Sequence, residues 1–339
     1  GVLDQARRPP LDRVCLWCGF FYFLVVSFDV CLFLFSLLFL FCWCFVLGSR
    51  FLYYALLVVA TVLWGSSFVF IKFSVESVSG FGYTFYRMLI AVALLTPVVL
   101  LRISRGLFDY RGFVGGLAVG VAYMLGLLLQ GIGTRYTLPS TSAFITGLNT
   151  VHVHIYCAFV ERSYSLDLLA SLLMALTGLY MVTAPSGGFG FGEAMVFAGS
   201  IAWGAQIVLV SRYGRVARSY TDFLYGMFLP SLALAPYALV VDDPRSIGLG
   251  TWLYIAYLAI ACSVAASYLQ VIGQKHVNPA IASIIYLLEP FFALLFSIFI
   301  YGERADLVRV AGGALITLAI FVSARGGTRS GGGGSACSW

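Results

Sequence analysis

The sequence predicts an all-α membrane protein in which ten transmembrane helices form two inverted five-helix repeats. Three observations lead to this prediction. The 339 residues are 61% hydrophobic and only 10% charged, whereas a soluble chain carries about a quarter charged residues. The charges lie between long apolar runs, each close to the roughly 20 residues that a helix needs to cross hydrocarbon. The sequence pattern of the first five runs then returns in the last five.

The first fifty residues stand apart from this pattern. They contain an apolar run at 14–47 and five of the eight cysteines. If the run spanned, the arginines before it would lie outside, although cytoplasmic loops normally carry the excess of Lys and Arg. Cys15 and Cys18 have a C-x-x-C spacing, but no second pair follows at a metal-binding spacing, so we expect no metal site. We interpret 1–50 as lying largely upstream of the true start, or as an extra peripheral hydrophobic helix.

Ten apolar runs follow, joined by loops too short for a soluble domain. Each is predicted to be one helix, and they cover residues 52–72, 82–101, 113–131, 139–160, 166–183, 193–211, 220–241, 251–272, 279–300 and 307–324.

The basic residues predict the topology of these helices. If the first run starts inside, eleven Lys and Arg residues fall on the inner side and five on the outer side. This asymmetry places both ends of the ten-helix unit in the cytoplasm, with the plasma membrane as the expected location. The net charge of +6 is therefore a topology signal, and no nucleic-acid partner is expected.

Two stretches 140 positions apart share one pattern. Residues 130–144 read QGIGTRYTLPSTSAF and residues 270–284 read QVIGQKHVNPAIASI. Other matches keep an offset of 139 or 140, and they pair Trp64 with Trp203, Ser67 with Gln206, Pro139 with Pro279, and Asn149 with Glu289.

The duplication defines the domain organisation. A first repeat at 51–184 and a second at 193–325 are separated by a Gly-rich linker at 185–192, and a flexible Gly/Ser-rich tail follows at 326–339. Because five is odd, the second repeat enters the membrane from the opposite side. Inverted repeats of this kind characterise many secondary transporters, whose substrate sites lie near the midplane between the repeats.

Three motifs also resemble a known family. They are WGSSFVFIK near the start of the first repeat, SAFITGLNTVH followed by ER later in that repeat, and IASIIYLLEPFFALLFSIFIYGER in the second. Over roughly 52–325 the chain resembles the EamA-like ten-helix permeases of the drug/metabolite transporter (DMT) superfamily. The resemblance implies efflux or uptake of small organic molecules such as amino acids, metabolites or drugs, with both termini in the cytoplasm.

Glu289 is the main candidate for ion coupling. It lies about ten residues into its run, or about 15 Å deep. An ionised carboxylate at that depth must pair, reach water or take a proton. A structural role is the alternative, in which the carboxyl bonds a neighbouring helix beside the kink at Pro290.

The candidate substrate-binding residues are polar or aromatic side chains expected at similar depth. They are Trp64, Ser67, Asn149, His152, Trp203, Gln206 and Tyr286. A Trp beside a small or amide side chain suits a cavity wall, although Gly65 and Gly204 equally suit close helix packing. His152 lies three residues after Asn149, on the same helix face.

Other polar residues are assigned structural roles. Arg87 is expected to extend toward the lipid head groups, and attraction of an anionic substrate is the alternative role. Gln130 and Gln270 are expected to hold the two halves together. The pair His152 and His154 diverges on a helix, which argues against a shared metal.

These features predict a secondary active transporter, an exporter of small organic solutes that works by alternating access, with protons or cations as coupling partners. No Walker-type phosphate loop is present, and no cofactor or enzymatic activity is expected. The alternatives are a nucleotide-sugar or phosphate-ester exchanger of the same superfamily, and a membrane-embedded enzyme or a scaffold without transport.

Overall fold

The computed structural model describes residues 49–161, 166–183, 189–277, 282, 285–286, 288–304 and 307–329. All regular structure in these ranges is helical. The chain from Tyr53 onward forms one compact unit, separate from Gly1–Leu52. The predicted run at 14–47, with its five cysteines, lies outside the described residues.

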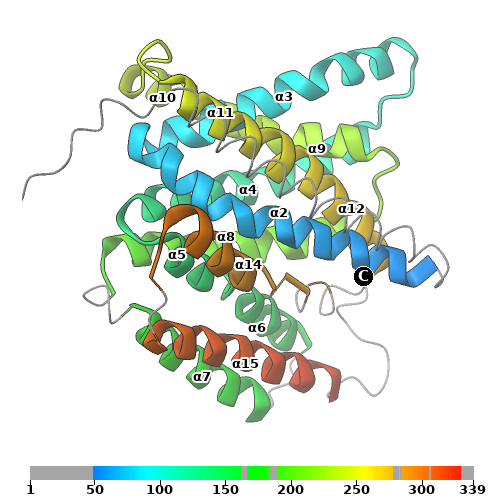
Figure 1. The fold of residues 1–339 in the computed structure, drawn as a ribbon. Helices are drawn as coiled ribbons and strands as arrows, with labels where there is room; N and C mark the ends of the chain where they lie inside the picture. Colours follow the sequence, from blue (N-terminus) through cyan, green and yellow to red (C-terminus); the bar gives the residue numbers. More distant parts are fainter. Residues whose placement is uncertain are drawn as a thin grey trace, which may run out of the picture. The chain divides into compact units, whose positions relative to one another are not determined.

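The first five predicted runs correspond to six helices (Figure 1). These are α2 (Ser49–Ser77), α3 (Gly80–Ser104), α4 (Tyr110–Tyr136), α5 (Pro139–Thr146), α6 (Asn149–Glu161) and α7 (Leu166–Thr183).

The prediction of one helix over 139–160 is wrong, because a turn at Gly147 and Leu148 separates α5 from α6. The Leu148 amide donates to the Ile145 carbonyl, 3.1 Å away and only three residues back. This tighter bond interrupts the regular α-helical pattern.

The helices of the second half are interrupted more often. They are α8 (Phe191–Tyr213), α9 (Tyr220–Phe228), the 3₁₀ segment η2 (Leu229–Leu234), α10 (Ala235–Val241), α11 (Leu249–Tyr257), the π-helical η3 (Leu258–Ala265), α12 (Ala266–His276), α14 (Leu288–Phe296), the π-helical η4 (Ser297–Tyr301) and α15 (Leu307–Arg329).

Two helices are longer than their predicted runs. Helix α8 begins at Phe191, inside the predicted linker, because the Glu193 carboxylate accepts a hydrogen bond from the Gly190 amide at 3.1 Å and fixes the helix start there. Helix α15 continues to Arg329, past the predicted start of the flexible tail at 326. Helix ends are the least certain part of a prediction from sequence, and residues 330–339 lie outside the described part of the chain.

Six helices of the described residues are long and apolar enough to cross a membrane. They are Leu52–Ser77, Gly80–Ser104, Tyr110–Tyr136, Phe191–Tyr213, Tyr220–Val241 and Leu249–His276. Leu288–Tyr301 and Leu307–Ile316 are shorter apolar helices. The described residues therefore form an all-α fold with helices that can cross a membrane, and the ten spans in two repeats stay a prediction.

Helix α4 packs along α8, and the two helices run antiparallel. Gly133, late in α4, meets the start of α8, where an added Cβ would lie 2.5 Å from the Gly192 carbonyl oxygen. Gly126 lies about two turns earlier in α4. It contacts the Trp203 ring, which is farther along α8. Small residues allow this close approach between helices in a membrane.

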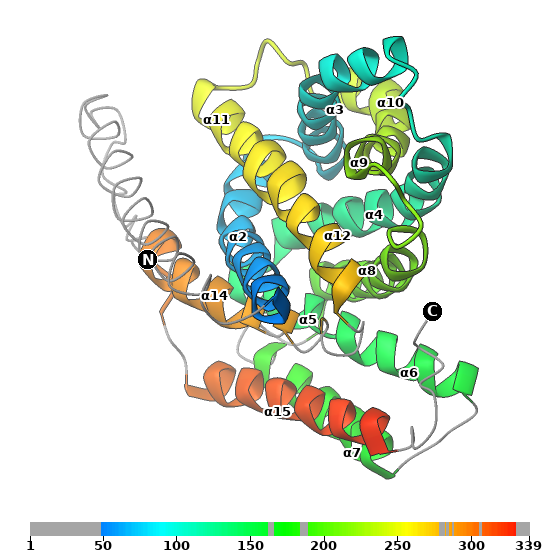
Figure 2. The same ribbon diagram turned by 90° about the vertical axis from the view of Figure 1, so that its right-hand side faces the viewer.

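Helix α2 packs in the same manner along the continuous helix formed by α11, η3 and α12, and both views place them side by side (Figures 1 and 2). The Trp64 Nε1–H donates to the Cys262 carbonyl at 3.0 Å. Nearer the start of α2, Leu57 fills the space beside Gly273. Earlier α2 residues thus meet later residues of the partner helix, so this pair is antiparallel too.

Helix α3 lies antiparallel to the α9–η2–α10 helix. At one end Arg102, near the end of α3, bonds Asp222 at the start of α9. At the other end Asp242, just after α10, accepts a bond of 2.8 Å from the backbone amide of Ser79, which caps α3. The two helices are therefore tied at both ends.

Candidate functional site

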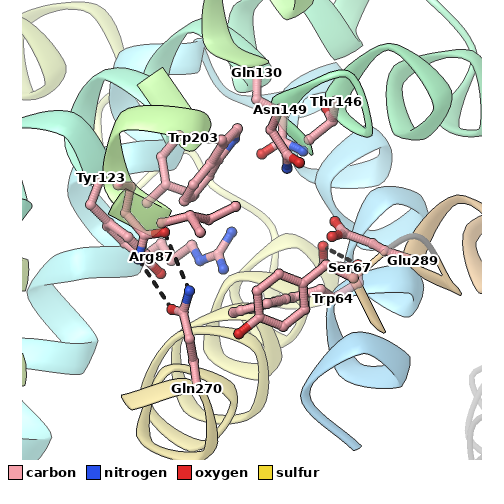
Figure 3. A pocket seen from close by; sticks show the side chains of 14 residues that line it. Trp64, Ser67, Arg87, Tyr123, Gln130, Thr146, Asn149, Trp203, Gln270 and Glu289 are labelled. Carbon is pink, nitrogen blue, oxygen red and sulfur yellow. Dashed lines mark hydrogen bonds between the residues drawn. The ribbon is translucent and has the colours of Figure 1, made fainter. Parts of the chain in front are cut away.

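A cavity lies in the interior of this helical unit, between α2, α3, α4, α8 and the segment around α14 (Figure 3). Its empty space, counted together with its opening, is about 510 Å³. The lining side chains are aromatic or polar for the most part, and they are Trp64, Ser67, Arg87, Tyr123, Leu127, Gln130, Thr146, Asn149, Trp203, Gln206, Ile207, Gln270, Tyr286 and Glu289.

The cavity brings together most of the residues that the sequence singled out. The predicted residues among its lining are Trp64, Ser67, Asn149, Trp203, Gln206, Tyr286 and Glu289. Their roles in binding and coupling stay predictions.

His152 is the predicted site residue that does not line the cavity. Its Nε2 lies 3.0 Å from the Ser200 hydroxyl on α8, and its ring meets the edge of Phe197 at 5.5 Å. A residue three positions after Asn149 shares its helix face only loosely, since three residues turn the helix by less than a full turn. His152 therefore joins α6 to α8.

The two tryptophans occupy different surroundings. The Trp64 indole is held by the Cys262 carbonyl and lies edge-on to Tyr286, with ring centroids 5.4 Å apart. The Trp203 ring stands edge-on to Tyr123 at 5.2 Å, and its Nε1–H has no hydrogen-bond partner in the described structure. A buried indole N–H without a partner is uncommon, and here it belongs to a wall of the cavity.

The packing interpretation of the Trp-Gly motifs is also supported. A Cβ at Gly65 would lie 2.5 Å from the Phe292 Cβ, and one at Gly204 would lie 3.1 Å from the Asn149 carbonyl oxygen. Each glycine therefore permits close contact with a neighbouring helix, while the tryptophan before it faces the cavity.

Gln206 and Gln270 satisfy one another. The Gln206 Nε2 donates to the Gln270 Oε1 at 3.1 Å, and the reverse bond measures 3.4 Å. Both side chains are buried, and a buried amide requires such a partner. The expectation that Gln270 joins the two halves is wrong, because its partner lies in the same half of the chain.

Arg87 lies in surroundings that differ from the expected ones. It is only 2% exposed, so the expectation that it reaches the head groups is wrong. Its Nε–H donates to the Ser263 hydroxyl at 2.7 Å, and its Nη1–H donates to the Tyr83 hydroxyl. Helix α3 begins at Gly80 rather than 82, which places Arg87 about 10 Å along the helix. Tyr83, one turn earlier on the same face, was the available signal.

Glu289 lies at the opposite side of the cavity from Arg87 and near Ser67 (Figure 3). Its side chain is half-buried. It makes no hydrogen bond or ion pair with another described residue. The described residues therefore give no support to the structural role, in which Glu289 bonds a neighbouring helix beside Pro290. The carboxyl faces the cavity instead.

Comparisons with known proteins agree with this architecture. The model of the EamA-like transporter family matches residues 51–184 and again 190–325. An uncharacterized transporter of Archaeoglobus fulgidus is 27% identical over 267 residues, which are 78% of this chain and 83% of the relative. A probable biotin transporter of Pseudomonas aeruginosa is 26% identical over 285 residues, covering 80% of this chain and 97% of the relative.

A solved crystal structure has the same fold, with a TM-score of 0.59 at 21% identity, and the match covers 84% of this chain and 100% of that one. Both halves of the chain match one family model, and the curated relatives are matched over most of their length. The chain therefore belongs to the EamA-like transporter family of the DMT superfamily and is a multi-pass integral membrane transporter.

Proposed function

We propose that the protein is a secondary active exporter of small organic solutes, which works by alternating access between inverted repeats at 51–184 and 193–325. The cavity is the observation that carries this proposal. Its lining comes from helices of both repeats, and it combines aromatic walls with a few polar groups, as solute sites in proteins do.

The inverted arrangement has support from helix packing. The duplication relates α3 to the helix at Tyr220–Val241, and these two helices run antiparallel to each other. The duplication likewise relates the α4–α8 pair to the pair formed by α2 and Leu249–His276, and both pairs pack antiparallel in equivalent places. Equivalent helices of opposite direction are what a module inserted once each way up produces.

Alternating access also requires bonds between the repeats that form and break. One such cluster joins Arg102 and Asp109 of the first repeat to Asp222 of the second. Another joins Ser140 of the first repeat to Glu303 of the second, which also faces Arg309 at 3.3 Å. The topology of the basic residues favours a cytoplasmic position for the first cluster, and both termini of the ten-helix unit in the cytoplasm of the cell.

Glu289 is our candidate for the coupling of transport to protons or cations. Ionisable groups inside a membrane are costly and are generally functional, and this one faces the cavity without a partner among the described residues. The phosphate-ester alternative is weaker, because Arg87 is the single basic residue among the lining side chains, whereas a phosphate dianion is usually bound by several cations.

The test is transport by purified protein in proteoliposomes, with amino acids, amines, nucleosides and biotin as candidate solutes. We expect movement of at least one solute, driven by an imposed proton gradient. Ser67→Trp would fill the cavity and abolish it, whereas Ser77→Trp, at the exposed end of α2, would leave it unchanged. Equal transport by the two variants would contradict the assignment of the cavity.

A further inference from the structure

Arg87 presents a buried positive charge to the cavity. The side chain is 2% exposed, and Figure 3 shows its guanidinium pointing into the space among the lining residues. A guanidinium carries five N–H donors. Within the described residues its hydrogen bonds go to Ser263 and Tyr83, and both partners are neutral hydroxyls. These contacts hold the group in a fixed orientation, and they leave its charge unbalanced.

No carboxylate of the described chain lies within ion-pair distance of Arg87. Asp222 forms an ion pair with Arg102, and Glu303 forms one with Arg309. Glu289 lines the same cavity but makes no ion pair with Arg87. A buried charge without a counter-ion is costly in a medium of low dielectric constant, and an anion that enters the cavity would remove that cost.

The rest of the lining narrows the chemistry of such an anion. A guanidinium binds a carboxylate through two parallel hydrogen bonds. Four aromatic side chains face the same space, and they are Trp64, Tyr123, Trp203 and Tyr286. Aromatic walls suit a flat or apolar body. The unpartnered Trp203 Nε1–H offers one further donor.

We propose that the transported solute is an organic carboxylate with a flat apolar body, whose carboxylate binds Arg87. This inference rests on the proposed function of the same cavity and adds the class of solute. Ser263 and Tyr83 position the guanidinium, and the aromatic side chains contact the body of the solute. A neutral analogue of the solute should therefore bind much more weakly, because it lacks the carboxylate that balances the charge of Arg87.

The test measures binding to the purified full chain in detergent by calorimetry and by thermal stabilisation. The probes are phenylpropionate and indoleacetate, each compared with its own primary amide, which has nearly the same shape without the charge. We expect the carboxylates to bind roughly 10- to 100-fold more tightly than the amides, as expected for loss of hydrogen bonds to a charged group.

Variants assign this preference to Arg87. Arg87→Gln is expected to bind acid and amide equally, and Arg87→Lys, which keeps the charge but not the paired donors, is expected to retain part of the preference. Arg135→Gln removes an exposed arginine outside the cavity and serves as the matched control. If Arg87→Gln does not fold, the comparison of acid with amide on the natural chain and on Arg87→Lys still decides.

The proposal is overturned if no carboxylate of the panel binds, if the amides bind as tightly as the acids, or if folded Arg87→Gln keeps the preference. Transport measured in proteoliposomes tests the proposed function separately from binding. Carboxylates that bind through Arg87 but never cross the membrane would support a carboxylate-binding site at Arg87 and refute transport. Neutral solutes that cross, while carboxylates neither bind nor cross, would support transport and refute the inference.

Discussion

The bond between Arg102 and Asp222 should hold the two halves of the chain together at one end of α3. The Arg102 Nε–H lies 3.0 and 3.1 Å from the two Asp222 carboxylate oxygens, and the Asp109 backbone amide donates to Asp222 at 2.8 Å. Asp222 is fully buried, whereas the Arg102 side chain is 28% exposed. Breaking the pair from either side is therefore expected to have unequal costs.

Arg102→Gln leaves a buried carboxylate without its cation, and removal of one partner of a buried pair costs about 3 kcal/mol or more. Asp222→Asn leaves a cation that still reaches water, so the loss is nearer to about 2 kcal/mol, the range of a charge-assisted hydrogen bond. In the double variant both losses share one interaction, and we expect a coupling energy of about 1–2 kcal/mol.

Reversible unfolding in mixed micelles of detergent and dodecyl sulfate measures these free energies of unfolding. Arg105→Gln, which changes an exposed arginine in the adjoining loop, is the matched control and should change the free energy of unfolding by less than about 0.5 kcal/mol. The reasoning is refuted if the two single effects add in the double variant, or if Asp222→Asn costs more than Arg102→Gln.

Three further predictions concern packing, pH and coupling. Gly116→Ala should lower the free energy of unfolding by about 1–3 kcal/mol, because the new Cβ would lie 2.0 Å from the Phe223 carbonyl oxygen. Gly250→Ala is the control and should not lower it, because open space surrounds Gly250. Equal melting temperatures for the two variants would argue against the packing. Burial alone would raise the pKa of Asp109, but hydrogen bonds from three backbone amides and a nearby arginine bring its pKa below the usual value. The ionised Asp109 carboxylate therefore stabilises the fold at pH values above its usual pKa, and this stabilisation is lost as the pH falls through its lowered pKa. The acid side of the melting-temperature profile should flatten in Asp109→Asn, and an unchanged profile would contradict this. Glu289→Gln should make transport in proteoliposomes insensitive to an imposed pH gradient, and full retention of the gradient's effect would exclude Glu289 as the coupling group.

Much of the fold follows from the apolar runs and the duplication. Runs of about 20 apolar residues have few alternatives to a membrane helix, because every backbone polar group must be satisfied inside the segment. The duplication then assigns equal depth to equivalent positions. This is why Trp64 and Trp203, or Asn149 and Glu289, were predicted together and line one cavity.

The remaining features depend on which helices are neighbours, and one sequence does not contain that information. The bond between Gln206 and Gln270 requires α8 and α12 to touch. The burial of Arg87 requires Ser263, from the distant η3 segment, to lie beside it. Helix spacing alone predicts that His152 faces the cavity, whereas the packing of α6 on α8 brings its ring to Ser200.

Accessibility of two equivalent loops tests the central claim most directly. Single cysteines at Leu107, between α3 and α4, and at Ser246, between α10 and α11, would be placed in a chain whose eight natural cysteines are replaced. Both positions are exposed. With a thiol reagent that cannot cross the membrane, we expect intact cells to be labelled at the Ser246→Cys position and only opened cells at the Leu107→Cys position. Labelling of both positions from the same side would contradict the opposite insertion of the two halves.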